Sequence, residues 1–159
     1  MPLSPELFKH LLGRFATGVT VVTAKHDNGM HGLTVSAFSS VSLRPPLILI
    51  CVDNRGTSHQ VISEGDAFVV NILSEQQTDL AYRFANPKLS GEARFENLTY
   101  HASEQGIPIL ADTLAYLECR TVQSIDAGDH TIFVAEVQNG SFAEEKSPMV
   151  YYRGEFHTL

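Results

Sequence analysis

The β-type segments of this chain follow one another through short turns, and this order restricts the fold more than any other feature. Residues 19–24 read VTVVTA, and the turn residues DNG at 27–29 separate them from the run LTVSAFSSVSL at 33–43. Two long alternating segments, YLECRTVQSI and TIFVAEVQNG, are joined in the same way by DAGD at 126–129. Segments rich in β-branched residues and joined by such turns predict antiparallel hairpins.

Three further apolar segments predict strands. The continuous run LILICV is expected to be buried on both faces, AFVVNIL forms another strand, and MVYYRGEFHTL closes the chain as the last one. The stretch 88–105 has weak periodicity and is interpreted as a loop with one short strand around Phe95. About seven strands joined mostly by turns favour an antiparallel barrel over a doubly wound parallel sheet.

A short helix is expected near the start of the chain. Ser4 precedes Pro5 in a pattern typical of a helix start, and Leu7, Leu11 and Phe15 then recur at four-residue spacing. This spacing places one apolar stripe on the helix.

Two more short helices are expected between the strands. Thr57 or Ser58 can cap a helix that runs through Glu64. Ser74 and Gln77 have capping-box spacing ahead of TDLAYRFAN, which predicts the other.

The composition excludes several classes of protein. With 159 residues the chain has the size of one domain, 1–159. Its 11 Lys and Arg residues against 18 Asp and Glu give a net charge of −7 without a basic cluster in the sequence, which argues against nucleic-acid binding. No apolar stretch approaches the ~20 residues of a membrane helix. Two cysteines without CxxC spacing indicate a reducing compartment, so a cytoplasmic location is expected.

Two polar segments are the first candidates for a binding site, since the chain holds no GxGxxG, P-loop, GxSxG or HExxH motif and no histidine spacing that predicts a metal site. The hydroxyl-rich run 34–40 either binds a polar planar ligand or is an exposed strand of small polar residues. The segment DNRGTS at 53–58 follows an expected strand and opens a helix. Its N–H groups, hydroxyls and arginine either hold a phosphate, with Arg83 as a second cation, or form a plain capped turn.

Two segments in the second half of the chain are further candidates. His130 follows a Gly-Asp turn at a strand start, where its side chain can project from a barrel rim or simply occupy the surface. Tyr151, Tyr152 and Arg153 precede Gly154 and suit stacking on a base or a nicotinamide. The alternative for this segment is an edge strand with one tyrosine packed inward.

Taken together, the segments resemble the flavin reductase-like family, the small NAD(P)H:flavin oxidoreductases that serve two-component flavin monooxygenases. The resemblance is carried, in this order, by FKHLLGRFATGVTVVTA, GLTVSAFSSVSLRPPLILICVD, TSHQVISEGDAFVVNIL, LAYRFA, GIPIL, YLECR, AGDHTIFVAEV and PMVYYRGEFHTL. It implies a mainly β chain, an FMN-binding split β-barrel with short flanking helices, that acts as a homodimer with flavin near the subunit interface.

The resemblance also implies which residues bind cofactors. Contacts to FMN or FAD would come from Thr34, Val35, Ser36, Ala37, Ser39, Ser40, Cys51, Val52, Asp53, Arg55, Thr57, Ser58, Arg83 and Phe84. NADH or NADPH would bind at His130, Tyr151, Tyr152, Arg153 and Gly154, with His130 positioning the nicotinamide. Hydride would pass between the cofactors without a dedicated acid or base.

The activity implied is reduction of free flavin, which then diffuses to a separate monooxygenase acting on an aromatic substrate. Two alternatives remain open at this point. A related barrel could hold its flavin permanently as an electron carrier or an oxidase, and a non-enzymatic barrel could use the same pocket for a small ligand.

Overall fold

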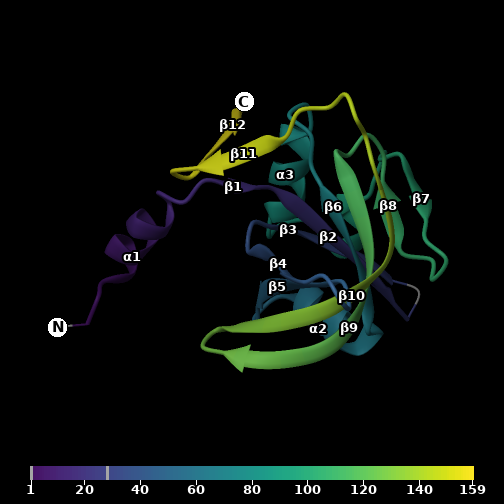
Figure 1. Cartoon of the computed structure of the whole chain (residues 1–159), viewed down its shortest axis with the longest axis horizontal. Coiled ribbons are helices and arrows are strands. Elements are labelled where there is room, and N and C mark those ends of the chain that lie inside the picture. Colours follow the sequence, from purple (N-terminus) through teal and green to yellow (C-terminus); the bar gives the residue numbers. More distant parts are fainter. Residues whose placement is uncertain (1, 28) are drawn as a thin grey trace.

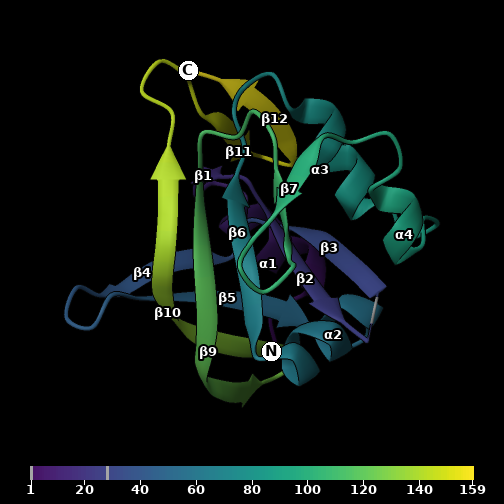
Figure 2. The same ribbon diagram turned by 90° about the vertical axis from the view of Figure 1, so that its right-hand side faces the viewer.

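Seven antiparallel strands form the main sheet of this computed structural model, which describes residues 2–27 and 29–159 (Figures 1 and 2). Across the sheet, the strand order is β3 (Gly29–Val35), β2 (Thr20–His26), β6 (Ala67–Ile72), β9 (Ala115–Ala127), β10 (His130–Phe142), β5 (Leu47–Asp53) and β4 (Phe38–Ser42). The two hairpins that the turn signals predict, β2–β3 and β9–β10, are confirmed. Asn28, expected in the first turn, lies outside the described residues. The mainly β, antiparallel fold agrees with the prediction.

Two smaller sheets complete the strands. β1 (Thr17–Gly18), β11 (Met149–Tyr152) and β12 (Glu155–Thr158) form one of them, in the order β1-β11-β12, and β7 (Tyr100–Ala102) pairs with β8 (Pro108–Leu110). The expectation of a single last strand is wrong. Positive φ angles at two successive residues, 52° at Arg153 and 80° at Gly154, reverse the chain in a tight turn between β11 and β12.

Two other expectations about strands need correction. The run 33–43 is divided between β3 and β4, because the chain leaves its pairing with β2 after Val35 and β4 pairs with β5 at the opposite edge of the main sheet. β5 is fully buried on one face only, since Ile48, Ile50 and Val52 are buried and the residues between them are half-buried. Continuous hydrophobicity does not show which face of a strand the rest of the molecule covers.

The stretch 88–105 also differs from the expected loop. It contains the short helix α4 (Gly91–Arg94) and the strand β7. Phe95 caps α4 and lies 4% exposed, with its ring 5.1 Å from that of Phe84. The expected strand at Phe95 is therefore a helix end that packs into the core.

The three expected helices are present with different caps. α1 (Pro5–Leu12) begins as predicted, with Ser4 Oγ accepting a hydrogen bond from Leu7 N. α2 (Thr57–Gly65) has Gly56 at its N-cap and no side-chain cap, so neither Thr57 nor Ser58 has the predicted role. α3 (Thr78–Ala85) is capped by Gln77 itself, whose side chain accepts a bond from the backbone N–H of residue 74.

Hydrophobic side chains form two main cores on opposite faces of β2. Val22 packs into the larger core with Phe68 and Phe133, and α2 contributes Ile62 to it. On the other face, the second core contains Val19, Val21, Leu73, Ala81, Phe84, Phe95, Leu110 and Met149. α3 and the β11 sheet are thus anchored to the main sheet through this second core.

α1 is not anchored in this way. It projects away from the sheets (Figure 1), and no residue of the helix is buried. Of the predicted stripe, Leu7 and Leu11 lie on the helix and are 49% and 55% exposed, whereas Phe15 lies beyond the helix end and is 76% exposed. Among the described residues, no helix has the length and apolar character needed to cross a membrane.

Candidate functional site

A pocket of about 820 Å³ lies between α1 and two connections of the body, the β3–β4 link and the β11–β12 turn. Figure 1 shows how these elements are arranged. The residues that line it are Lys9, His10, Leu12, Gly13, Arg14, Phe15, Thr17, Ser36, Ala37, Phe38, Tyr151, Arg153 and Gly154. Five of these come from the predicted site, and they unite a segment expected to bind flavin with one expected to bind the nicotinamide nucleotide.

Backbone hydrogen bonds fix the β3–β4 link at the pocket. Phe38 N donates to Ser36 O over 3.0 Å, and Cys51 N donates to Ala37 O over 3.1 Å. These bonds hold the link in place, and Ser36 and Ala37 are exposed. The backbone and the small side chains of these two residues are therefore available to a planar ligand.

The β11–β12 turn forms the opposite wall. Arg153 N donates to Gly13 O over 2.9 Å, which ties the turn to the end of α1. Tyr151 lines the pocket and also packs against Phe156, with ring centroids 5.4 Å apart. The sequence left open that this segment is an edge strand with one tyrosine packed inward. Tyr151 does pack inward, but β11 is the middle strand of its sheet. Tyr152 points to the other face and does not line the pocket.

The charge of the pocket is opposite to that of the chain. Lys9, Arg14 and Arg153 line it, and none of its lining residues in the part of the chain that the structure describes is acidic. A chain of net charge −7 therefore collects positive charge at this one surface. The sequence showed no basic cluster, because the three cations come together only through folding. Such a surface favours an anionic ligand.

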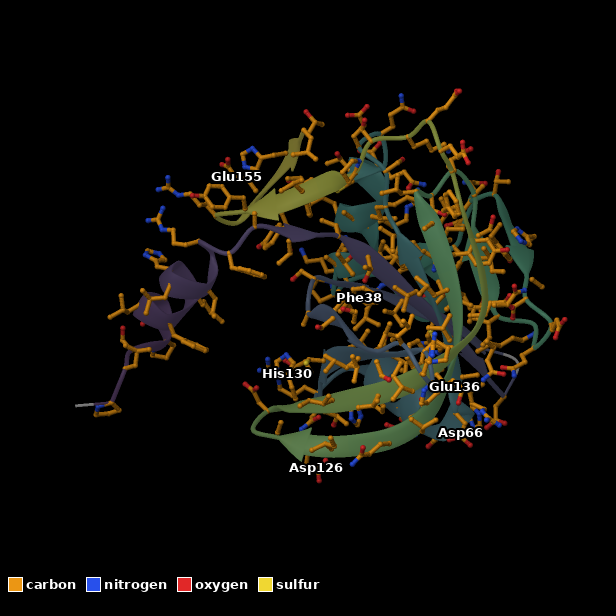
Figure 3. The ribbon with its side chains drawn as sticks, in the orientation of Figure 1. Phe38, Asp66, Asp126, His130, Glu136 and Glu155 are labelled. Atoms are coloured by element: carbon orange, nitrogen blue, oxygen red, sulfur yellow. The ribbon has the colours of Figure 1, made fainter. Side chains whose placement is uncertain are left out.

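A second group of predicted residues lies on one face of β5 and β10. His130 is the register partner of Asp53, so these two side chains share a face of the sheet. Cys51 lies on the same face, two residues before Asp53, and burial raises the pKa of its thiol. Figure 3 shows His130 and Phe38 on the side of the body that faces α1. The group thus lies on the pocket's side of the molecule but does not line the pocket.

Charged groups near His130 are paired with one another. Asp53 Oδ1 accepts hydrogen bonds from Arg55 N and Nε at 2.9 and 3.1 Å, and Oδ2 accepts from Nη2 at 2.7 Å. The side-chain hydrogen bonds from Arg55 are the main reason why the pKa of Asp53 lies well below its usual range. His130 Nδ1 lies 2.7 Å from Asp129 Oδ1. The expected phosphate-binding arginine is therefore held by a carboxylate beside the start of α2.

The hydroxyl-rich run divides between exposed and internal positions. Ser39 and Ser40 are exposed on β4, and Ser39 Oγ donates to Ser40 O. Thr34 Oγ1 donates to Ala81 O of α3 over 2.7 Å. Val35 is 4% exposed and belongs to the larger core. The side chain of Thr34 therefore bonds to α3 and that of Val35 packs into the larger core, and neither lines the pocket.

Several other predicted residues have structural contacts. Val52 and Ser58 are buried, whereas Thr57 is exposed at the start of α2. Arg83 Nη1 donates to Glu96 O over 2.7 Å, and Phe84 is 1% exposed inside the second core. Neither residue of this pair lines the pocket.

Comparison with known proteins decides the family. The model of the family described as flavin reductase like domain matches residues 12–159. The chain belongs to the flavin reductase-like family. It is 42% identical over 155 residues to the reductase component of a 4-nitrophenol 4-monooxygenase/4-nitrocatechol 2-monooxygenase from Rhodococcus opacus, covering 98% of this chain and 81% of that protein.

Other members of the flavin reductase-like family are similarly close. FMN reductase (NADH) SmoA of Agrobacterium fabrum is 40% identical over 149 residues, which is 94% of this chain and 83% of that protein. The NADH:FAD oxidoreductase SgcE6 of Streptomyces globisporus, solved in complex with NAD and FAD fragments, has a TM-score of 0.92 and 32% identity. That likeness covers 100% of this chain and 96% of the solved one. The resemblance seen in the sequence motifs is confirmed.

The pocket of this flavin reductase-like chain suits a phosphorylated aromatic cofactor. Phe15, Phe38 and Tyr151 supply apolar walls, and the cations supply charge for phosphate. Thr17 Oγ1 is buried in the lining and has no hydrogen-bond partner among the described residues. It is a buried polar atom that the described protein groups leave without a hydrogen bond.

Sequence reasoning missed the contribution of α1 and of Thr17 and Phe38. A signal was available, because the segment FKHLLGRF places Lys9 and Arg14 on either side of an expected helix end. The pattern could not show, however, that this end meets the β11–β12 turn. That contact includes a hydrogen bond from Arg153 N to Gly13 O, between residues far apart in the sequence.

Proposed function

We propose that this chain is an NADH-dependent flavin reductase that reduces FMN or FAD and releases the reduced flavin to a separate monooxygenase. The observation that carries the proposal is the pocket, where the β3–β4 link, the β11–β12 turn and three cations meet in an otherwise acidic chain. The Rhodococcus, Agrobacterium and Streptomyces relatives bear names of this kind of enzyme. NADH is preferred to NADPH in the proposal because two of these names specify it.

The residues of the chain would bind and align the two cofactors. The cofactors themselves supply the chemistry, a hydride transfer from the nicotinamide ring to the flavin. Ser36 and Ala37 would hold the flavin ring through backbone groups, and Tyr151 and Phe38 would exclude water beside it. The exposed groups of 53–58, including Arg55 and the uncapped start of α2, would receive the flavin phosphate. His130, held by Asp129, would position the nicotinamide.

We further infer that the chain forms one domain and acts as a homodimer in the cytoplasm. α1 leaves Leu7 and Leu11 exposed, and apolar surface of this kind usually marks an interface. A second copy would cover it and would close the pocket from the open side. Both cysteines are free, which suits a reducing compartment.

The decisive experiment follows NADH oxidation by its absorbance with the purified protein and added flavin. We expect turnover with FMN or FAD in excess over protein, slower turnover with NADPH, and a protein that loses its yellow colour on ultrafiltration. Reduced flavin should pass through the filter when the reaction is run without oxygen.

Two results would favour the alternatives. A chromophore that survives ultrafiltration would indicate an electron carrier or an oxidase. Colourless protein that leaves NADH unoxidised with every flavin would indicate a barrel that only binds a small ligand.

A further inference from the structure

We propose that the end of α1 and the β11–β12 turn form a binding site for the diphosphate group of a dinucleotide, with Lys9, Arg14 and Arg153 as its cations. The inference rests on the proposed function, because it names the residues that recognise one substrate of that reaction. It assigns α1 to substrate binding, in addition to any part the helix has in dimer contact.

The three cations belong to two elements that the backbone joins. Lys9 lies in α1 and Arg14 follows it, with Gly13 N donating to Lys9 O over 2.8 Å across the helix end. Arg153 enters from the β11–β12 turn, and its N–H donates to Gly13 O over 2.9 Å. Gly13 thus serves as the junction at which both elements present positive charge to one pocket.

The pocket cations differ from three arginines that bind protein groups, and they differ from Arg44 and Arg120, which also have no side-chain partner among the described residues, because they line one pocket together. Arg55 is bonded to Asp53, and the guanidinium groups of Arg83 and Arg94 donate to backbone carbonyls. Within residues 2–27 and 29–159, no side-chain hydrogen bond or ion pair engages Lys9, Arg14 or Arg153. Their charge is therefore available to a ligand.

Three like charges at one pocket repel one another, so the arrangement favours an anion that lies among them. A diphosphate carries two adjacent anionic groups and can accept bonds from an ammonium and from guanidinium forks at the same time. NADH and FAD both contain this group, whereas FMN and reduced nicotinamide mononucleotide contain a single phosphate. The shared chemistry is thus the diphosphate, and the experiment distinguishes its two sources.

The test compares K9A/R14A and R153A with a matched control, K88A/R120A. The control pair removes two exposed positive charges that do not line the pocket, so it reproduces the change in net charge of the first variant. For each protein, KM is measured for NADH and for reduced nicotinamide mononucleotide with FMN as acceptor. Dissociation constants for FAD and FMN are measured by fluorescence titration.

If the diphosphate is that of NADH, the pocket variants should raise KM for NADH by about tenfold or more and change KM for the mononucleotide by less than about threefold. If the diphosphate is that of FAD, the pocket variants should lower the affinity for FAD by about tenfold and leave the affinity for FMN unchanged. Added salt should weaken the same constant in the wild type and have little effect on it in the variants, because exposed charges are screened.

A structural role for these side chains is tested separately. K9R/R14K keeps both charges and should retain constants close to the wild type, and circular dichroism and sedimentation should show a folded protein of unchanged oligomeric state in every variant.

The proposal is overturned if the mononucleotide and NADH constants rise together, if K88A/R120A has the same effect, or if only subunit association changes. Any of these results leaves the proposed function intact, since the wild type would still reduce flavin with NADH. Failure of the wild type to do so would instead remove the proposed function.

Discussion

At the scale of single residues, His130 offers the most direct test of the proposed site. Its Nδ1 atom is held 2.7 Å from the Asp129 carboxylate, which leaves Nε2 for a ligand. We expect His130→Ala to raise KM for NADH about tenfold and to change KM for flavin little, because the imidazole would contact only the nicotinamide nucleotide. Steady-state kinetics with each substrate varied in turn measures both constants. An unchanged NADH constant would remove the positioning role.

The Asp53–Arg55 pair makes a prediction about pH. The folded pKa of Asp53 lies below the ordinary value of about 3.9, so the pair contributes its stabilisation in full above that pH and loses it as pH falls through the lowered pKa. Carboxyl carbon shifts measured by NMR should show Asp53 ionised at a pH where an isolated aspartate is half protonated. In Arg55→Ala the titration should return toward the ordinary range. A wild-type titration already in that range would contradict the hydrogen-bonded geometry.

The sequence indicated which residues belong to the candidate site better than it indicated the hydrogen-bond partners of their side chains. The resemblance pointed to Ser36, Ala37 and Arg153, and the structure places all three at the pocket. Thr34 was expected there too, yet its hydroxyl donates to Ala81, a residue far along the chain. Such a partner is chosen by tertiary packing, which no local pattern records.

At the scale of elements, the strands were predictable and several boundaries were not. Turn chemistry and alternation gave β2, β3, β9 and β10, because both signals act within a few residues. The split of the run 33–43 escaped prediction, since Ser36 and Ala37 suit one continuous strand as well as a link between two strands. The link is held by the bond from Cys51 N to Ala37 O, which forms only when β4 pairs with β5.

Packing of α3 on the sheet gives a prediction about stability. Phe84 was expected to contact flavin, but it is 1% exposed and meets Phe95 edge to face at 5.1 Å. Phe84→Ala should therefore lower the free energy of unfolding by about 3–5 kcal/mol, measured by urea denaturation. Phe142→Ala makes the same deletion at a side chain that is 71% exposed, and should cost less than about 1 kcal/mol. Equal effects of the two changes would show that Phe84 is not a core residue.

At the scale of the whole molecule, the position of α1 is what the sequence could not determine. An amphipathic pattern predicts an apolar face and does not reveal what covers it. The rest of the chain leaves that face uncovered, although the same helix carries one cation of the pocket, Lys9, and a second, Arg14, directly follows it. A surface with apolar side chains on one side and charge on the other is consistent with a helix that meets a second subunit while it lines a site.

This arrangement predicts that subunit association and substrate binding depend on different residues in and just after α1. Leu7 and Leu11 are exposed on α1 and do not line the pocket. Replacing both by serine removes apolar contact and keeps Lys9 and Arg14, so we expect a dimer in the wild type and a shift toward monomer in L7S/L11S. Sedimentation velocity over a range of protein concentrations measures the change. V122S/L159S, which alters exposed apolar residues outside α1, should remain dimeric. If L7S/L11S also remains dimeric, the subunit contact lies on another surface and α1 acts in substrate binding alone.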